Sequence, residues 1–231
     1  QTLEGGPALI HCGPFGNIAT GTSSVVADQV ALSHADLVVT EAGFGADMGA
    51  ERFFNVKCRL GGLTPDAAVV VATVRALKAH SGTYDIRPGR ALPEGLFEES
   101  PDEVRAGLAN LRKHVEIIQS FGVTPVVAIN AFPQDHDSEH AVIAELAAEL
   151  GVRCAVTRHV AEGGAGGEDL AREVLAAVEE PTRFTTTYAL EDSLAEKIEA
   201  VATRIYGADG VDYTPAAAKS LQTYEDAGFG D

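Results

Sequence analysis

Five short apolar runs, separated by stretches with helical periodicity, constrain the fold of this chain most strongly. They are apolar at nearly every position, which is typical of parallel strands that helices cover on both faces. Strands that alternate with helices predict right-handed β-α-β crossovers and therefore a doubly wound, mostly parallel α/β sheet. The predicted strands are residues 8–12, 36–40, 67–74, 125–130 and 153–157.

The helices between these runs carry clear start signals. Ser100-Pro101-Asp102-Glu103 combines a capping box with proline at the first helical position. Ser193 and Glu196 form a second capping box, and Asp137 is predicted to cap the helix that ends at Gly151. Further helices are predicted at 22–34 and 168–178 and from Thr214 onward.

The domain organisation follows from where this pattern is interrupted. Residues 1–180 are predicted to form the α/β domain, and residues 83–99, rich in glycine and proline, to form an excursion from it. Pro181 ends the last α/β helix, so residues 181–231 are predicted to form an appended helical segment.

Composition excludes several classes of partner. The net charge of −17 repels phosphates, which excludes nucleic acids and anionic membranes as favoured partners. Cys12, Cys58 and Cys154 are odd in number and far apart, which argues against a disulfide framework or a zinc site and indicates a reducing cytoplasm. No metal site is predicted, and no apolar run reaches the ~18 residues that span a membrane.

The segment TEAGFGADMGAERFFNVKCR at 40–59 directly follows the second predicted strand. A connection of this length is uncommon in a compact domain, and its phenylalanines argue against a disordered linker. Gly43 and Gly45 flank Phe44 and allow positive φ angles or close approach to a ligand. Spacing alone leaves a packed surface loop and a functional site as equal alternatives.

This segment resembles the signature TEAGFGADxGxExFxxxKCR of the formate–tetrahydrofolate ligase family. Five further blocks occur in the family's order: HCGPFGNIATG at 11–21, VATVRALK at 71–78, VAINAFP at 127–133, AEGGAGG at 161–167 and IYGAD at 205–209. The resemblance runs from about Pro7 to the end of the chain. It implies a P-loop NTPase type of sheet, here incomplete.

The resemblance implies a two-step reaction with formate, ATP and tetrahydrofolate as substrates. ATP phosphorylates formate to formyl phosphate, and the N10 amine of tetrahydrofolate then displaces phosphate to give 10-formyltetrahydrofolate. It also implies a need for Mg²⁺, stimulation by monovalent cations and a homo-tetramer.

A partial chain is the expectation here, because the family carries its phosphate loop upstream and further sequence downstream. No lysine of this chain follows a glycine, so the loop G-x-x-x-x-G-K-[ST], which cradles phosphates, is not in this sequence. The chain also begins at Gln1. By itself it is expected to be inactive.

For the nucleotide, the resemblance singles out residues near two strand ends. The amide of Asn130 donates and accepts, which suits reading the edge of a purine or pterin ring, although a hydrogen bond within its own turn is the alternative. Related P-loop proteins place an asparagine here at the base. His11 and Gly13 belong to a block that adjoins the nucleotide site in the family.

For the folate, the resemblance implies that Phe132 and Pro133 line the site, with Phe132 stacking on the pteridine. The family usually has tryptophan where this chain has Val160, a departure that removes the second stacking face. His159 is the neighbour that would partly replace it. Phe44 is also predicted to contact folate, and Gly163 and Gly164 to permit its close approach.

Three charged residues of the signature segment are predicted to be catalytic. Glu41 would orient the metal–nucleotide or the folate amine, and Lys57 and Arg59 would bind an anion such as formyl phosphate. Surface ion pairs are the alternative for these cations. A second reading of the whole chain, a non-catalytic folate- or nucleotide-binding remnant, rests on the missing phosphate loop and on Val160.

Overall fold

The computed structural model of the chain describes residues 1–10 and 21–230, and these form two compact units. The sheet unit comprises Gln1–Ala8, Pro65–Gln119 and Val123–Thr182. The helical unit comprises Leu9–Thr64, Ser120–Gly122 and Arg183–Asp231, apart from its undescribed positions 11–20 and 231. Each unit is described by itself.

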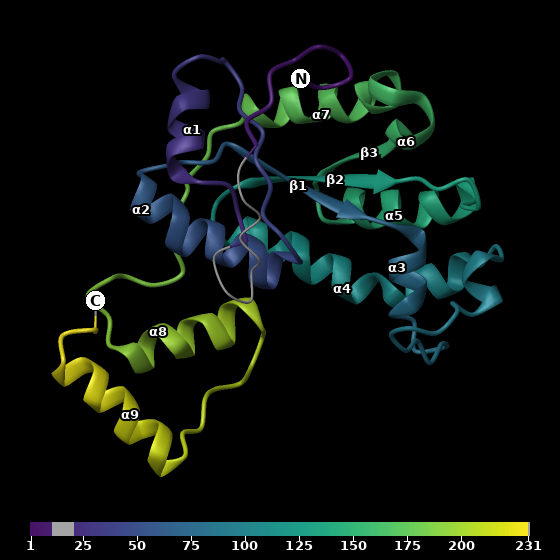
Figure 1. The fold of residues 1–231 in the computed structure, drawn as a ribbon. Helices are drawn as coiled ribbons and strands as arrows, with labels where there is room; N and C mark the ends of the chain where they lie inside the picture. The colour runs from purple at the N-terminus through teal and green to yellow at the C-terminus, as the bar shows by residue number, and fades with distance from the viewer. Residues whose placement is uncertain (11–20, 231) are drawn as a thin grey trace. The chain divides into compact units, whose positions relative to one another are not determined.

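The sheet unit contains three parallel strands in the order β1-β2-β3 (Figure 1). They are β1 (Ala67–Ala72), β2 (Thr124–Asn130) and β3 (Arg153–Thr157). Val127 of β2 is in register with Val70 of β1 and Cys154 of β3. These strands confirm the last three of the five predicted runs.

Helices cover both faces of this sheet. Val127 and Ile129 point from β2 into a core shared with α3 (Val74–Ala79), α4 (Pro101–Ser120) and α5 (Asp137–Glu149). The intervening β2 residues are buried on the opposite face, where α7 (Glu168–Val178) packs (Figure 1). Burial on both faces explains why these strands are apolar at consecutive positions.

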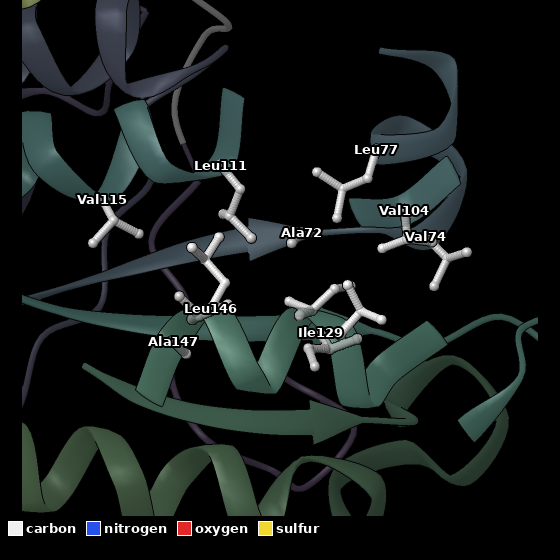
Figure 2. Packing of buried hydrophobic residues seen from close by; sticks show 12 residues of the cluster. Ala72, Val74, Leu77, Val104, Leu111, Val115, Ile129, Leu146 and Ala147 are labelled. Atoms are coloured by element: carbon white, nitrogen blue, oxygen red, sulfur yellow. The ribbon is translucent and has the colours of Figure 1, made fainter. Parts of the chain in front are cut away.

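The core of the sheet unit is built from the predicted apolar stripes (Figure 2). On α4 the buried stripe comprises Val104, Leu111 and Val115, with spacings that place one side chain on the same face every one or two turns. Ile143 and Leu146 extend the core from α5. Each such side chain contributes roughly 1.5–3 kcal/mol to the stability of the fold when it is fully buried. The cluster therefore stabilises the sheet, which positions the strand ends.

Two predicted strands are wrong as far as the structure describes them. Residues 37–40 are irregular, and Leu37 and Val39 are 54% and 93% exposed. Residues 8–10 are irregular too, and the rest of that predicted strand lies outside the described residues. A strand requires a hydrogen-bonded partner, and within the described ranges the only pairing near residues 37–40 is an isolated antiparallel bridge between Thr22 and Ala42.

The signature segment is largely helical rather than a surface loop. Wide, π-helical turns at Ala46–Ala50 and Phe53–Cys58 lead into α2 (Arg59–Gly61). Its apolar residues pack against segments distant in the chain: the ring of Phe54 lies 4.7 Å from that of Phe121 and 5.7 Å from that of Phe184. This packing stabilises the helical conformation, whereas the glycines of the segment by themselves suggest a loop.

The remaining helices agree with the capping signals, with two changes. Ser24 caps α1 (Val25–Leu32), which is shorter than the predicted helix at 22–34. The residue that precedes α5 is His136 rather than Asp137, and the backbone N–H of His136 donates to the carboxylate of Glu139. The capping box of Ser193 opens α8 (Leu194–Ala200), and Thr214 caps α9 (Pro215–Asp226). Short helical turns lie at Glu94–Phe97, Gly163–Gly167 and Val201–Ile205, and α6 is His159–Glu162.

None of the helices in the described part of the chain is both long enough and apolar enough to cross a membrane.

Candidate functional site

The carboxyl ends of β2 and β3 bring together two of the predicted site segments. Asn130 is paired in register with Thr157, and the N–H of Ala131 donates to the carbonyl of Thr157 at 3.0 Å. The loops that follow these two strands therefore start side by side. In open parallel α/β sheets, ligands bind beyond this edge.

Asn130 has an unsatisfied polar atom at this edge. Its Oδ1 is buried, and no hydrogen bond to it is formed by the described residues. Buried side-chain oxygens in proteins nearly always have a partner, so an isolated one requires an explanation. A ligand N–H would supply the missing partner, whereas the alternative of a hydrogen bond within its own turn is not observed for this oxygen.

A compact turn fixes the backbone of Phe132. Its N–H donates to Oδ2 of Asp135 at 2.9 Å, and the N–H of Asp135 donates back to the carbonyl of Phe132 at 3.0 Å. His140 Nε2 lies 3.4 Å from the same carboxylate oxygen, and both side chains are less than a tenth exposed. A buried aspartate with these contacts holds the turn in a single conformation.

The ring of Phe132 is held by a cation. The guanidinium carbon of Arg75 lies 4.3 Å from the centroid of Phe132 and 5.2 Å from that of Phe97. Sequence reasoning did not assign a role to Arg75, although it lies within the block at 71–78 that supports the family resemblance. Arg75 itself lies on α3, and its contacts connect this helix to the turn at Glu94–Phe97 and to the loop after β2.

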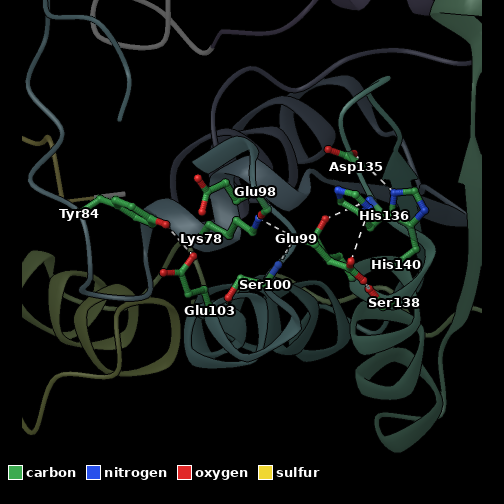
Figure 3. Close-up of polar contacts among 11 residues, drawn as sticks. Lys78, Tyr84, Glu98, Glu99, Ser100, Glu103, Asp135, His136, Ser138 and His140 are labelled. Carbon is green, nitrogen blue, oxygen red and sulfur yellow. Dashed lines mark hydrogen bonds and ion pairs between the residues drawn. The ribbon is translucent and has the colours of Figure 1, made fainter. Parts of the chain in front are cut away.

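A buried ion pair between Lys78 and Glu139 stabilises the same unit, and Figure 3 shows Lys78 with its neighbours Glu98 and Ser100. Lys78 Nζ lies 2.5 Å from Glu139 Oε1, both side chains are 1% exposed, and Lys78 also donates to the carbonyl of Glu98. Glu139 accepts from the N–H groups of Ser100 and His136 at 2.9 and 3.0 Å. The pair therefore joins α3, the end of the excursion at 83–99 and the start of α5.

The protonation of Glu139 follows from these contacts. Burial alone would raise the pKa of its carboxyl, but the hydrogen bonds from Lys78, Ser100 and His136 stabilise the charged form and lower the pKa below its ordinary value. Glu139 is therefore a charged structural group at neutral pH.

The loop after β3 places the other predicted folate residues. His159 Nδ1 lies 2.8 Å from the hydroxyl of Thr157, and Val160 on α6 is 74% exposed. Gly163 has φ of 61° with extended ψ, a conformation that excludes most side chains. A Cβ on Gly164 would lie 2.5 Å from a carboxylate oxygen of Glu4, so the space beside Gly164 is taken by that side chain.

In the helical unit, Phe44 has an unusual backbone. Its φ is 67°, the only positive φ of a non-glycine residue in the described ranges, and its side chain is 65% exposed. Gly43 and Gly45 allow positive φ angles or close approach to a ligand, and neither has a positive φ in the structure. The N–H of Gly43 donates to Gly21, and a Cβ on Gly49 would lie 1.7 Å from the carbonyl oxygen of Gly43. Gly43 and Gly49 are thus closely packed, and the positive φ of this turn occurs at Phe44.

The two cations of the signature segment are engaged by protein groups. Lys57 Nζ lies 2.5 Å from Asp28 Oδ2 and donates to Ser23 at 2.8 Å, and the Lys57 and Asp28 side chains are 3% and 7% exposed. Arg59 donates to the carbonyls of Asn55 and Tyr188 at 3.0 and 2.6 Å. Their predicted binding of an anion would require these contacts to be exchanged.

Other residues of the signature segment differ in exposure and reactivity. Glu41 is exposed in irregular backbone. Burial raises the pKa of the Cys58 thiol to about 12, with a smaller opposing effect from Lys57, and it raises the pKa of Cys154 to about 11. Both cysteines therefore remain thiols at neutral pH and are poor nucleophiles.

The structure divides the predicted site residues between the two units. Within the sheet unit lie Asn130, Phe132, Pro133, His159, Val160, Gly163 and Gly164. Within the helical unit lie Glu41, Phe44, Lys57 and Arg59. His11 and Gly13 lie outside the described residues. Among residues 1–10 and 21–230, no group of three or more histidine, cysteine, aspartate or glutamate side chains is placed to hold a metal ion.

Comparison with known proteins identifies the family. The sequence model of formate–tetrahydrofolate ligase matches residues 1–231, which is the whole chain. The chain belongs to the formate–tetrahydrofolate ligase family. This agrees with the blocks at 40–59 and 127–133, whose residues lie on the described segments above.

Individual members of the family are similar along the whole chain. Formate–tetrahydrofolate ligase of Cutibacterium acnes is 57% identical over 230 residues, and that of Saccharopolyspora erythraea is 60% identical over 230 residues. Formate–tetrahydrofolate ligase 3 of Rubrobacter xylanophilus is 59% identical over 239 residues. All three alignments include 100% of this chain but only 41–42% of the relative. The chain therefore spans about two fifths of the length of these ligases.

Proposed function

We propose that this chain supplies the pteridine-binding part of an enzyme that ligates formate to tetrahydrofolate at the expense of ATP. The observation that carries the proposal is the pairing of Asn130 and Phe132 at one strand end, within a chain that belongs to the ligase family. The fixed ring of Phe132 offers a stacking face for the pteridine, and the unsatisfied amide oxygen of Asn130 can accept a hydrogen bond from an N–H group on the edge of the nucleotide base.

In the proposed reaction, ATP phosphorylates formate, and the N10 amine of tetrahydrofolate attacks the carbon of formyl phosphate. Phosphate leaves, and 10-formyltetrahydrofolate remains. Phe132 and Pro133 orient the pteridine by stacking, and His159, Val160 and the glycines Gly163 and Gly164 form the opposite wall of the proposed pocket. Correct placement of two reactants contributes strongly to such a transfer, because it removes the entropic cost of bringing them together.

The nucleotide and the anionic intermediate are assigned to further residues from the family resemblance. Asn130, with His11 and Gly13, is proposed to contact the nucleotide, and Phe44 to contact folate from the signature segment. Glu41 is proposed to orient the metal–nucleotide or the folate amine. Lys57 and Arg59 are proposed to bind formyl phosphate, after Lys57 exchanges Asp28 for the anion. The described residues contain no metal-binding cluster, so we assign no Mg²⁺ ligand to them.

The wider architecture is also proposed from the family. The three parallel strands would be part of a larger doubly wound sheet of the P-loop NTPase type, with the phosphate loop on a segment not contained in this sequence. The full-length enzyme is proposed to be a homo-tetramer that monovalent cations stimulate. The division into an α/β domain at 1–180 and a helical segment at 181–231 is proposed for the same full-length chain.

The proposal predicts a selective effect of Phe132→Ala in the full-length protein. Loss of the stacking face should raise the KM for tetrahydrofolate by about tenfold, as expected for ~1–3 kcal/mol of ring stacking. The KM for ATP should change by less than about twofold. The measurement is a steady-state titration of each substrate with the others saturating.

Phe132→Tyr is the matched control, because it retains the aromatic face and should bind tetrahydrofolate nearly as the wild type does. Equal effects of Phe132→Ala on both substrates, or an effect on ATP alone, would show that the ring packs the loop or contacts the nucleotide, contrary to the proposal.

A further inference from the structure

Arg75 contacts two aromatic rings from separate segments of the sheet unit. Phe97 comes from the turn at Glu94–Phe97, Arg75 from the first turn of α3, and Phe132 from the loop after β2. The guanidinium carbon of Arg75 lies over both rings, 5.2 Å from the centroid of Phe97 and 4.3 Å from that of Phe132. An arginine over an aromatic face is attracted by the negative charge density of that face.

Arg75 differs from most arginines of the sheet unit, because within the described residues it has no carboxylate partner. Other arginines of the sheet unit form ion pairs: Arg153 with Glu173 and Glu180, and Arg172 with Glu168 and Asp169. Within the described ranges, Arg75 has neither a hydrogen bond nor a carboxylate partner, although the chain has 34 acidic and 17 basic residues. The two rings are therefore its principal partners.

The segment that supplies Phe97 is firmly anchored. The next residue, Glu98, accepts a hydrogen bond from buried Lys78, and the N–H of Ser100 donates to Glu139 (Figure 3). On the other side of Phe97, Leu96 is 3% exposed. The excursion at 83–99 thus ends in a rigid turn that holds Phe97 against Arg75.

We propose that Arg75 and Phe97 are positioning residues for folate binding. Arg75 covers part of the Phe132 ring, Phe97 keeps Arg75 in place, and Asp135 fixes the backbone of Phe132. The half-buried ring then offers its remaining surface to the pteridine in a preset orientation. This inference rests on the proposed stacking role of Phe132, and it gives the excursion at 83–99 a function in substrate binding.

Preorganisation has a specific kinetic consequence. A ring that is already in its bound orientation loses less conformational freedom when the ligand binds. Removing the support should therefore weaken tetrahydrofolate binding without removing any group that contacts tetrahydrofolate. The effect should be smaller than that of Phe132→Ala and should disappear when Phe132 is absent.

The test uses the full-length protein and tetrahydrofolate titration. We expect Phe97→Leu and Arg75→Met each to raise the KM for tetrahydrofolate about three- to fivefold, as expected for loss of a partly desolvated cation–π contact. Phe97→Tyr should restore near wild-type values because it retains the ring. The KM for ATP should be unchanged in all three variants.

Arg87→Ala is the matched control within the same excursion. It removes an arginine whose only described ion pair is the exposed contact with Asp85, and it should leave both KM values unchanged. Circular dichroism and urea unfolding establish that each variant is folded.

A double-substitution cycle separates this inference from the proposed function. Arg75→Met should have no further effect on the tetrahydrofolate KM in a Phe132→Ala background. If Phe132→Ala leaves the tetrahydrofolate KM unchanged, the proposed folate contact is wrong. If Phe132→Ala raises it but Phe97→Leu and Arg75→Met do not, or if their effects add to that of Phe132→Ala, the positioning role is wrong and the proposed function stands.

Discussion

Replacing Lys78 by methionine should lower the free energy of unfolding of the chain by about 3–5 kcal/mol, the range for breaking a buried ion pair by removal of one partner. Methionine matches the length of the lysine stem but leaves the carboxylate of Glu139 without a counter-ion in a site that is 1% exposed. The carbonyl of Glu98 also loses its donor. Urea unfolding followed by circular dichroism measures the loss.

Two variants separate the buried charge from general packing. The double variant Lys78→Met, Glu139→Gln removes both charges and should recover part of the lost stability. Arg105→Ala breaks an exposed ion pair with Glu145, which joins α4 to α5, and should cost less than about 1 kcal/mol. A Lys78→Met variant as stable as Arg105→Ala would contradict the account of this pair.

The stability that Lys78→Met loses relative to the wild type should depend on pH in a defined direction. The lowered pKa of Glu139 means that its contribution to stability is present above the pKa of an unfolded glutamate and is lost as pH falls through the folded value. In Lys78→Met the carboxyl loses the stabilising cation, so its pKa rises. The stability difference between wild type and variant should therefore narrow as pH decreases from neutral toward 4; a constant difference would contradict this.

Gly107→Ala should destabilise the sheet unit by about 3 kcal/mol or more, the upper part of the range for overpacking. Helix propensity alone predicts the opposite sign, because alanine is favoured over glycine by about 1 kcal/mol within a helix. Here a Cβ would lie 1.9 Å from the carbonyl oxygen of Leu77, which is rigid backbone of α3. The steric term is therefore expected to exceed the propensity term.

Gly167→Ala provides the comparison, because a Cβ there meets no atom within 4 Å and its φ of −109° is accessible to alanine. It should change stability by less than about 1 kcal/mol. Urea unfolding of both variants tests the argument, and a Gly107→Ala variant that is as stable as wild type would show that α3 and α4 separate easily.

The parts of the fold that the sequence predicted are those set by local pattern. The strands β1, β2 and β3 follow from continuous apolar runs, and α4 follows from a capping box and a stripe ending at Ile118. Residues 36–40 have the same apolar character, yet they are irregular. Composition indicates that a segment favours a strand, but pairing depends on a neighbouring strand that local sequence does not specify.

The site was predictable to a similar degree. Family blocks singled out Asn130 and Phe132 as candidates, and the structure places Asn130 at the end of β2 and Phe132 in the loop that follows. No local pattern indicates that Arg75 contacts both Phe97 and Phe132, because these contacts join residues 22 to 57 positions apart in the chain. The positive φ of Phe44 was also missed, since it results from the close packing of Gly43 against Gly49.

The most direct test of the central proposal is product formation by the full-length protein supplied with formate, ATP, Mg²⁺ and tetrahydrofolate. The account predicts that 10-formyltetrahydrofolate and ADP form in equal amounts and that product formation stops when any one of formate, ATP or tetrahydrofolate is omitted. A folded full-length protein that binds tetrahydrofolate or ATP but forms no 10-formyltetrahydrofolate would contradict the proposed ligase activity and favour a non-catalytic binding protein of the same family.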